Sequence, residues 1–240
     1  MHIKILFSKI VLLIILISTI SCNNKDILKS PNFILILSDD QGWNGTSYEM
    51  ISGSDYSKSD YYETPNLENL AKSGMVFSRA YSPAPTCSPT RYAIQFGQTP
   101  ARLKHIRVSM NVDHIDHKGM TTIPRALKRI DSNYVAGHFG KFGMYSDPKN
   151  FGYDFSDGMT GNIDGNIDGT VQTKWLPQHD EDPKQIFGIT KRSLSFMEEQ
   201  VKQDNPFFLQ VSHYAVHSDL VSRKETVSYT HLRAHETACY

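Results

Sequence analysis

A continuous apolar run places the strongest constraint on what this chain folds into. Residues 32–38 have the sequence Asn-Phe-Ile-Leu-Ile-Leu-Ser, and the acidic pair Asp39 and Asp40 follows directly. An apolar run without polar alternation is typical of a strand that is buried on both faces of a largely parallel sheet. The run therefore predicts a buried strand whose carboxyl end carries two carboxylates.

Predicted helices alternate with further predicted strands along the rest of the chain. This βαβα order favours a wound α/β domain, in which ligands bind beyond the carboxyl ends of the strands. Asp39, Asp40 and Lys141 all fall at such ends. The helices are expected at residues 64–74, 123–130 and 182–204, with another at the Cys87 segment, and the further strands at residues 75–81, 134–139 and 207–211.

The charge of the chain argues against one broad class of function. The 240 residues include 25 basic and 25 acidic side chains. Such a balance gives no indication of nucleic-acid binding, so any specificity for an anion has to come from a local site. Without its leader and tail, the chain is long enough for one domain with a sizeable core.

Residues 1–21 have the pattern of an export signal, with two lysines before an apolar run. As a helix this run would span about 16 Å, against about 30 Å for the hydrocarbon core of a bilayer, so it is too short for a permanent span. Ser21-Cys22 followed by two asparagines resembles a bacterial lipoprotein cleavage site, which implies a lipid anchor at Cys22 and a linker at residues 22–30. Secretion with Cys22 unmodified is the alternative. Either route predicts a protein in the bacterial periplasm or at the cell surface.

Cys87 is the single thiol in the body of the chain, because Cys22 lies at the leader boundary and Cys239 in the tail. No disulfide framework is therefore expected. A lone thiol in an exported protein calls for a chemical explanation, because the compartment is potentially oxidising.

The residues around Cys87 predict a site for an anion. Pro89 suits the first position of a helix and Ser88 the cap before it, which places Cys87 at a positive helix end. Such an end attracts anions and lowers the pKa of a thiol. Arg91 adds a permanent cation one turn on. The segment indicates an enzyme that acts on an anion, and an idle or buried cysteine is the plain alternative.

The spacing Cys-X-Pro-X-Arg at residues 87–91 resembles the signature of the type I sulfatases. In that family a maturation enzyme oxidises the cysteine to formylglycine, and the hydrate of this aldehyde attacks sulfur before sulfate is eliminated. The resemblance implies that Cys87 is the precursor of the nucleophile and that Arg91 belongs to the catalytic site. A thiol phosphatase loop fits less well, because its arginine stands farther from the cysteine.

The resemblance also implies a fold and a cofactor. The fold is an alkaline-phosphatase-like sandwich, here incomplete, with a mostly parallel mixed sheet and helices on both faces. Asp39 and Asp40 match the two aspartates that bind calcium, or magnesium as the alternative, at the end of the first strand, and the modified Cys87 is the third expected metal ligand. Two adjacent carboxylates repel each other unless a cation or hydrogen bonds compensate, which is consistent with this role.

Two more residues match sulfatase positions, and one departs from them. Lys141 resembles the lysine that contacts the sulfate and the ester oxygen, and His217 resembles a histidine that contacts sulfate and protonates the leaving group. Gly143 stands where the family usually has a histidine that hydrogen-bonds the formylglycine hydroxyls. His138 lies inside a predicted strand and is not expected to replace that histidine, and His213 is expected to have a core or surface role, with a place beside the site as the alternative. Residues 113–117 and 161–169 are expected to be solvated loops rather than metal sites.

The resemblance extends over about residues 31–226, less than the length of a whole sulfatase. Residues 227–240 do not continue the pattern and resemble translated adapter sequence, so a non-native tail is expected there. The chain is therefore expected to be an inactive N-terminal fragment of an exported enzyme that hydrolyses sulfate monoesters, with sulfated carbohydrate as its substrate. The alternatives are a phosphatase or phosphodiesterase of the same superfamily, and a lipoprotein that binds sulfated glycans without turnover.

Overall fold

The computed structural model describes residues 29–161 and 182–217. The chain divides into two units, residues 1–30 and residues 31–240, and every helix and strand named below belongs to the second. Several predictions lie outside the described residues: the export signal at 1–21, the lipid-bearing Cys22, nearly all of the loop at 161–169 and the tail at 227–240. Within the described ranges, no helix is long and apolar enough to cross a membrane.

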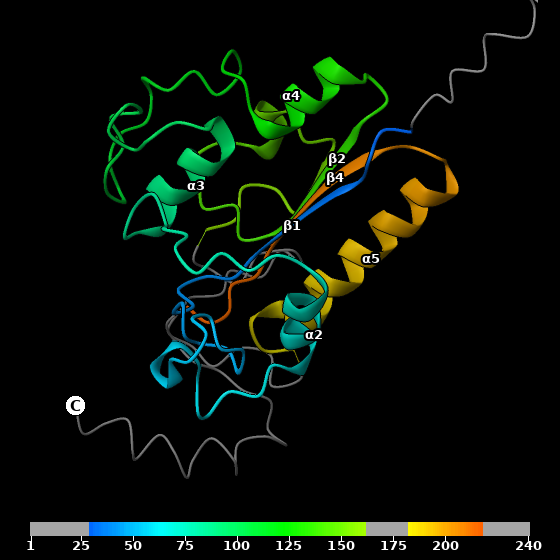
Figure 1. The fold of residues 1–240 in the computed structure, drawn as a ribbon. Coiled ribbons are helices and arrows are strands. Elements are labelled where there is room, and N and C mark those ends of the chain that lie inside the picture. The colour runs from blue at the N-terminus through cyan, green and yellow to red at the C-terminus, as the bar shows by residue number, and fades with distance from the viewer. Residues whose placement is uncertain (1–28, 162–181, 218–240) are drawn as a thin grey trace, which may run out of the picture. The chain divides into compact units, whose positions relative to one another are not determined.

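A four-stranded sheet lies at the centre of the second unit (Figure 1). Its spatial order is β1-β4-β2-β3, and all the described pairings are parallel. Every residue of β4 is buried, because this strand lies between two long neighbours. The α/β class and the parallel pairing predicted from the sequence are confirmed. The strands are β1 (Phe33–Leu37), β2 (Val135–Gly140), β3 (Phe155–Ser156) and β4 (Phe207–Ser212).

Helices cover both faces of the sheet, with α5 on one side and α3 and α4 on the other (Figure 1). Successive side chains of a strand point to opposite faces. Phe208 of β4 accordingly packs in the core beneath α3, whereas its neighbours Phe207 and Leu209 pack against α5. The helices are α2 (Pro65–Ser73), α3 (Cys87–Phe96), α4 (Ile123–Ile130) and α5 (Ile186–Lys202), and the 3-10 turns are η1 (Asp55–Ser57), η2 (Pro148–Phe151) and η3 (Pro183–Gln185).

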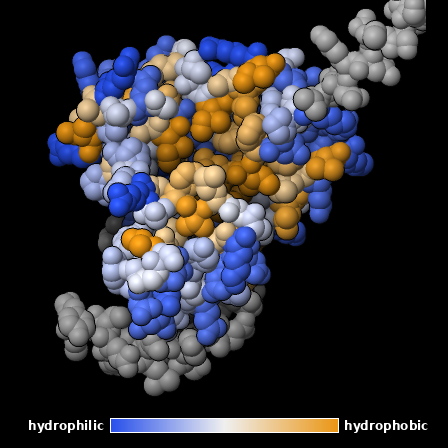
Figure 2. Space-filling view, in the orientation of Figure 1, coloured by the Kyte–Doolittle hydropathy of each residue, from blue (hydrophilic) through white to orange (hydrophobic). Residues whose placement is uncertain are grey.

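Two predictions about strands were wrong: the burial of β1 on both faces, and the presence of a strand at residues 75–81. β1 forms where expected, but it pairs only with β4 among the described strands, so its apolar side chains are not buried on both faces. Ile36 is 65% exposed, and apolar side chains gather at the surface over this part of the sheet (Figure 2). Residues 75–81 form no strand, and their large side chains Met75, Phe77 and Tyr81 are exposed. The prediction rested on apolar composition alone, which does not show whether a neighbouring strand is present to pair with the segment.

The helix at Cys87 begins two residues earlier than predicted. Cys87 is its first residue and Thr86 the N-cap, so Ser88 and Pro89 lie inside the first turn. The hydroxyl of Ser88 instead contacts Nε2 of His105 at 2.8 Å, in a buried position. Cys87 still lies at the positive end of the helix, so the expectation that depended on this placement survives the shift.

A chain of buried polar groups crosses the core beneath α3. His138 of β2 is fully buried, with Nε2 3.2 Å from Oγ of Ser212 on β4. Gln210 donates to the same hydroxyl at 3.1 Å, and its Oε1 accepts from Gln95 and from Tyr153. Burial, and secondarily the charge of Arg91, lower the pKa of His138 to about 3. His138 is therefore a neutral structural histidine at ordinary pH.

His138 should make the fold sensitive to acid. Below about pH 6.5 the ring of His138 becomes protonated in the unfolded chain but stays neutral in the folded chain. The contribution of this neutral ring to the free energy of unfolding is therefore full above about pH 6.5 and is lost as the pH falls towards 3. His138→Gln keeps a polar partner for Ser212 without a titrating group. We expect the loss of unfolding free energy between about pH 7 and pH 5 to be smaller in the variant by about 2 kcal/mol, measured by urea titration. Equal losses in both proteins would contradict this expectation.

Gly140 should tolerate no side chain at the end of β2. Its φ is +94°, and an added Cβ would lie 2.0 Å from the carbonyl oxygen of Ser212. Gly140→Ala is therefore expected to lower the free energy of unfolding by roughly 3 kcal/mol or more. Gly158 is the matched control, because it has a φ of +84° with open space around its Cβ position. Gly158→Ala should cost only about 1 kcal/mol, and equal costs in urea unfolding would show that the clash is not the cause.

Candidate active site

A cleft of about 420 Å³ opens between the carboxyl end of β1 and the first turn of α3. The sequence placed two carboxylates at the end of that strand and a thiol with an arginine at the start of that helix, and the structure brings all four into one cleft. Parallel strands end at a common edge, which explains the convergence. The lining residues are Leu37, Ser38, Asp39, Asp40, Gln41, Ser82, Ala84, Pro85, Thr86, Cys87, Thr90 and Arg91.

Asp39 lies between two cations at the base of this cleft. Its Oδ1 is 3.4 Å from a terminal nitrogen of Arg91, and its Oδ2 is paired with the ammonium of Lys141. Arg91 also donates to the carbonyl oxygen of Lys141. All three side chains are at most 5% exposed. Buried charges are stable when they are paired and hydrogen-bonded, and here two cations share one carboxylate, so the cluster has a spare positive charge.

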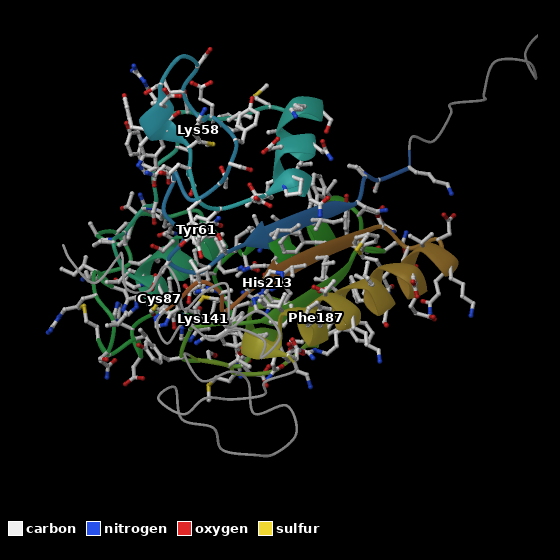
Figure 3. All side chains as sticks on the ribbon, turned by 90° about the horizontal axis from the view of Figure 1, so that it is seen from below. Lys58, Tyr61, Cys87, Lys141, Phe187 and His213 are labelled. Atoms are coloured by element: carbon white, nitrogen blue, oxygen red, sulfur yellow. The ribbon has the colours of Figure 1, made fainter. Side chains whose placement is uncertain are left out.

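Lys141 lies beside the cleft and does not line it in the described structure. It follows β2, as predicted, and its backbone N–H donates to the carbonyl oxygen of Ser212 at 2.8 Å. Its ammonium is committed to Asp39. Figure 3 labels Lys141 together with Cys87 at this end of the sheet. The sulfate contact predicted for Lys141 stays a prediction.

Asp40 points to a different environment from Asp39. Its φ of +58° turns the chain sharply, and its side chain is 56% exposed. Nε2 of His217 lies 3.6 Å from one of its carboxylate oxygens. The segments after β1 and β4 are joined by two backbone hydrogen bonds, Asp39 N–H to Ala215 O at 2.9 Å and Val216 N–H to Asp39 O at 2.7 Å. These bonds explain why His217 arrives beside the acidic pair.

The donors present fit a hard divalent cation in kind. Carboxylate oxygens are the ligands that calcium and magnesium prefer, and calcium takes about six to eight of them. Asp39 and Asp40 supply carboxylates, although both oxygens of Asp39 are paired here with Arg91 and Lys141, and Cys87, the predicted third ligand, lines the same cleft. Among residues 29–161 and 182–217, no group of three or more acidic, histidine or cysteine side chains is gathered tightly enough to hold a metal. A complete shell would need further ligands.

The structure gives a physical reason for Gly143. Its φ is +64°, and an added Cβ would lie 2.7 Å from Cδ of Arg91. With this backbone, a histidine at position 143 would collide with Arg91. The departure from the sulfatase pattern is therefore coupled to the buried position of Arg91.

Residues 113–117 and His213 do not line the cleft. Asp113 and Asp116 are exposed, in agreement with a solvated loop, but His117 packs against the core, with Nε2 2.9 Å from the hydroxyl of Tyr92. His213 is partly buried, and burial lowers its pKa. The sequence analysis missed two residues that contact the Lys141 turn, Asp157 and Thr160. No local motif marks either of them.

Comparisons with known proteins identify sulfatases as relatives of this chain. The sulfatase family model matches residues 31–237. A sulfatase from Formosa agariphila is 45% identical over 95 residues, which is 38% of this chain and 17% of that protein. Mouse N-acetylgalactosamine-6-sulfatase is 40% identical over 72 residues, 30% of this chain and 12% of its own length. Human arylsulfatase G is 30% identical over 140 residues, 55% of this chain and 24% of its own length.

Solved structures show the same fold at low sequence identity. Ps i-CgsB has a TM-score of 0.61 at 23% identity, over 83% of this chain and 48% of that one. BT4656, solved with D-glucosamine-2-N,6-O-disulfate, has a TM-score of 0.61 at 19% identity, over 85% of this chain and 38% of that one. An alkaline phosphatase superfamily protein from Vibrio parahaemolyticus has a TM-score of 0.51 at 21% identity, over 82% and 43%.

The matched segments thus span less than a quarter of the curated relatives named above and less than half of these solved chains. The family model nevertheless covers most of this chain, including the aspartate pair, the Cys87 segment, Lys141 and His217. The chain belongs to the sulfatase family.

Proposed function

We propose that this chain is the N-terminal part of an exported, formylglycine-dependent sulfatase that hydrolyses sulfate monoesters. The observation that carries the proposal is the shared cleft, in which Cys87 of the Cys-X-Pro-X-Arg pattern lies with Asp39, Asp40 and Arg91. A fragment is supported by the short coverage of the relatives. The proposed boundaries are residues 31–226 for the catalytic part and 227–240 for a non-native tail.

The charges of the site suit an anionic substrate. A sulfate monoester keeps its negative charge at ordinary pH, so catalysis has to rely on fixed positive charge rather than on protonation of the substrate. Arg91 and Lys141 provide two buried cations against the single carboxylate of Asp39. A calcium ion, or magnesium as the alternative, held by Asp39, Asp40 and the modified Cys87 would supply further positive charge that stabilises the sulfate.

The chain's own residues take distinct roles in this proposal. Cys87, converted to formylglycine by a maturation enzyme, provides the attacking oxygen from the first turn of α3. Arg91 and Lys141 orient the sulfate group, and the hydrogen bond from the guanidinium of Arg91 to the carbonyl oxygen of Lys141 holds them as one unit. His217 contacts the substrate and protonates the departing oxygen, and its Nε2 lies 3.6 Å from a carboxylate oxygen of Asp40.

Sulfated carbohydrate is the proposed substrate class. N-acetylgalactosamine-6-sulfatases are among the curated relatives, and one solved neighbour contains a sulfated glucosamine. The leader at residues 1–21 supports export to the bacterial periplasm or the cell surface, with a lipid anchor at Cys22.

A phosphatase or phosphodiesterase is the second candidate, because the fold is shared with the alkaline phosphatase superfamily. Cys87 favours sulfate, since those enzymes normally have a threonine or serine nucleophile. Binding of sulfated glycans without turnover is the remaining alternative, prompted by Gly143.

Conversion of Cys87 tests the formylglycine proposal directly. When the chain is produced together with a formylglycine-generating enzyme, the tryptic peptide that ends at Arg91 should contain an aldehyde in place of the thiol, visible as a mass loss and by reaction with a hydrazide probe. In the full-length enzyme, Cys87→Ala should abolish sulfate release while the thermal unfolding midpoint stays unchanged. An unmodified thiol, or retained sulfate release by Cys87→Ala, would contradict the proposal.

The 240-residue chain by itself should be inactive. The chain spans less than half of the solved structures named above, and in this proposal the remaining metal ligands belong to the part of the enzyme beyond it. We expect no release of sulfate from sulfated monosaccharides above background in an ion-chromatography assay, even after conversion of Cys87 and with calcium added. Measurable turnover would show that the site is complete in this chain and would remove the fragment proposal.

A further inference from the structure

We propose that Thr160 is a positioning residue that holds Lys141 in place. Lys141 lies in a turn formed by residues 140–143, directly after β2. Thr160 lies beyond β3, nineteen residues later in the chain. It is 8% exposed and contacts the turn on both sides of Lys141. Its catalytic meaning rests on the proposed function, but its structural effect on Lys141 does not.

Three hydrogen bonds connect Thr160 with the turn. Its hydroxyl donates to the carbonyl oxygen of Gly140 at 2.6 Å and accepts from the N–H of Phe142 at 2.8 Å. Its carbonyl oxygen accepts from the N–H of Gly143, also at 2.8 Å. One residue therefore satisfies backbone groups immediately before and after Lys141.

The other polar groups of the turn are held from three directions. The N–H of Gly140 donates to a carboxylate oxygen of Asp157 at 2.8 Å. That carboxylate also pairs with Arg192 of α5 at 2.8 Å. The N–H of Lys141 donates to Ser212, and its carbonyl oxygen accepts from Arg91. Segments around β3, β4 and α3 thus converge on the backbone that carries the ammonium group.

The hydroxyl of Thr160 matters because the turn has little rigidity of its own. Gly140 and Gly143 both have positive φ, and glycine retains the most backbone freedom when its external contacts are lost. Without the hydroxyl, the carbonyl of Gly140 and the N–H of Phe142 would be buried without a partner, which favours local opening. An open turn would release Lys141 from Asp39, and small displacements of a group that orients substrate are costly in catalysis.

The protection of Lys141 from a chemical reagent tests whether Thr160 holds the turn, and this test does not require enzymatic activity. We would treat the chain with an acetylating reagent and follow each lysine by mass spectrometry. In Thr160→Val, which keeps the shape and removes the hydroxyl, acetylation of Lys141 should rise about tenfold relative to the wild-type chain, because local opening becomes easier. In Thr160→Ser, which keeps the hydroxyl, Lys141 should stay protected. Lys184 is 6% exposed and serves as an internal reference for global unfolding.

Thr122→Val is the matched control. Thr122 is 1% exposed, and its hydroxyl donates to the carbonyl oxygen of Phe151 and accepts from the N–H of Arg125, away from Lys141. This variant should lower the unfolding midpoint but leave Lys141 as protected as in the wild type. The proposal is overturned if Thr160→Val leaves Lys141 protected, if Lys184 becomes reactive to the same degree, or if Thr160→Ser exposes Lys141 as Val does. If the acetylation pattern is as expected but Cys87 is never converted to formylglycine, the role of Thr160 in holding Lys141 is supported and the sulfatase proposal is contradicted.

Discussion

The buried carboxylate of Asp39 is the interaction on which the site depends. It follows β1, and it holds Arg91 from α3 and Lys141 from the end of β2. Breaking a buried ion pair by removing one partner commonly costs about 3–5 kcal/mol, because the other charge is left without compensation. Here the removal of Asp39 would leave two cations facing each other. Two strands and a helix are therefore tied together at their ends by one side chain, which is also a proposed metal ligand.

This arrangement links the packing of the site to its chemistry. Each cation near Asp39 has a second anchor: Arg91 donates to the carbonyl of Lys141, and the backbone of Lys141 is bonded to Ser212. Gly143 completes the coupling, since a side chain there would push against Arg91. Preorganised charge stabilises a developing anion because no reorganisation is needed during the reaction. The same contacts that remove freedom from the folded chain therefore prepare it for an anionic ligand.

The sequence predicted much of the fold because its signals were local. The apolar runs gave β1 and β4 nearly residue by residue, and the helices expected at residues 64–74 and 123–130 match α2 and α4 closely. The expected burial of β1 failed because burial depends on neighbouring strands that a local pattern does not contain. The strand expected at residues 75–81 failed for a similar reason. Asp39, Asp40 and Lys141 could be placed together because the ends of parallel strands share one edge of the sheet, whereas Cys87 and Arg91 were placed with them by the sulfatase resemblance.

The role of Thr160 could not be predicted from the local sequence. A threonine next to glycines has the composition of any loop, and its role arises from backbone groups far away in sequence that only the β2-to-β3 pairing brings close. Asp157 is similar, because its carboxylate joins the turn to α5 through Arg192. The catalytic pattern of the sequence thus names the groups that would touch the sulfate, while the geometry of those groups is set by residues that the pattern does not include. In this chain the ammonium of a lysine contacts a carboxylate, while the backbone on both sides of it is bonded to a hydroxyl nineteen residues away.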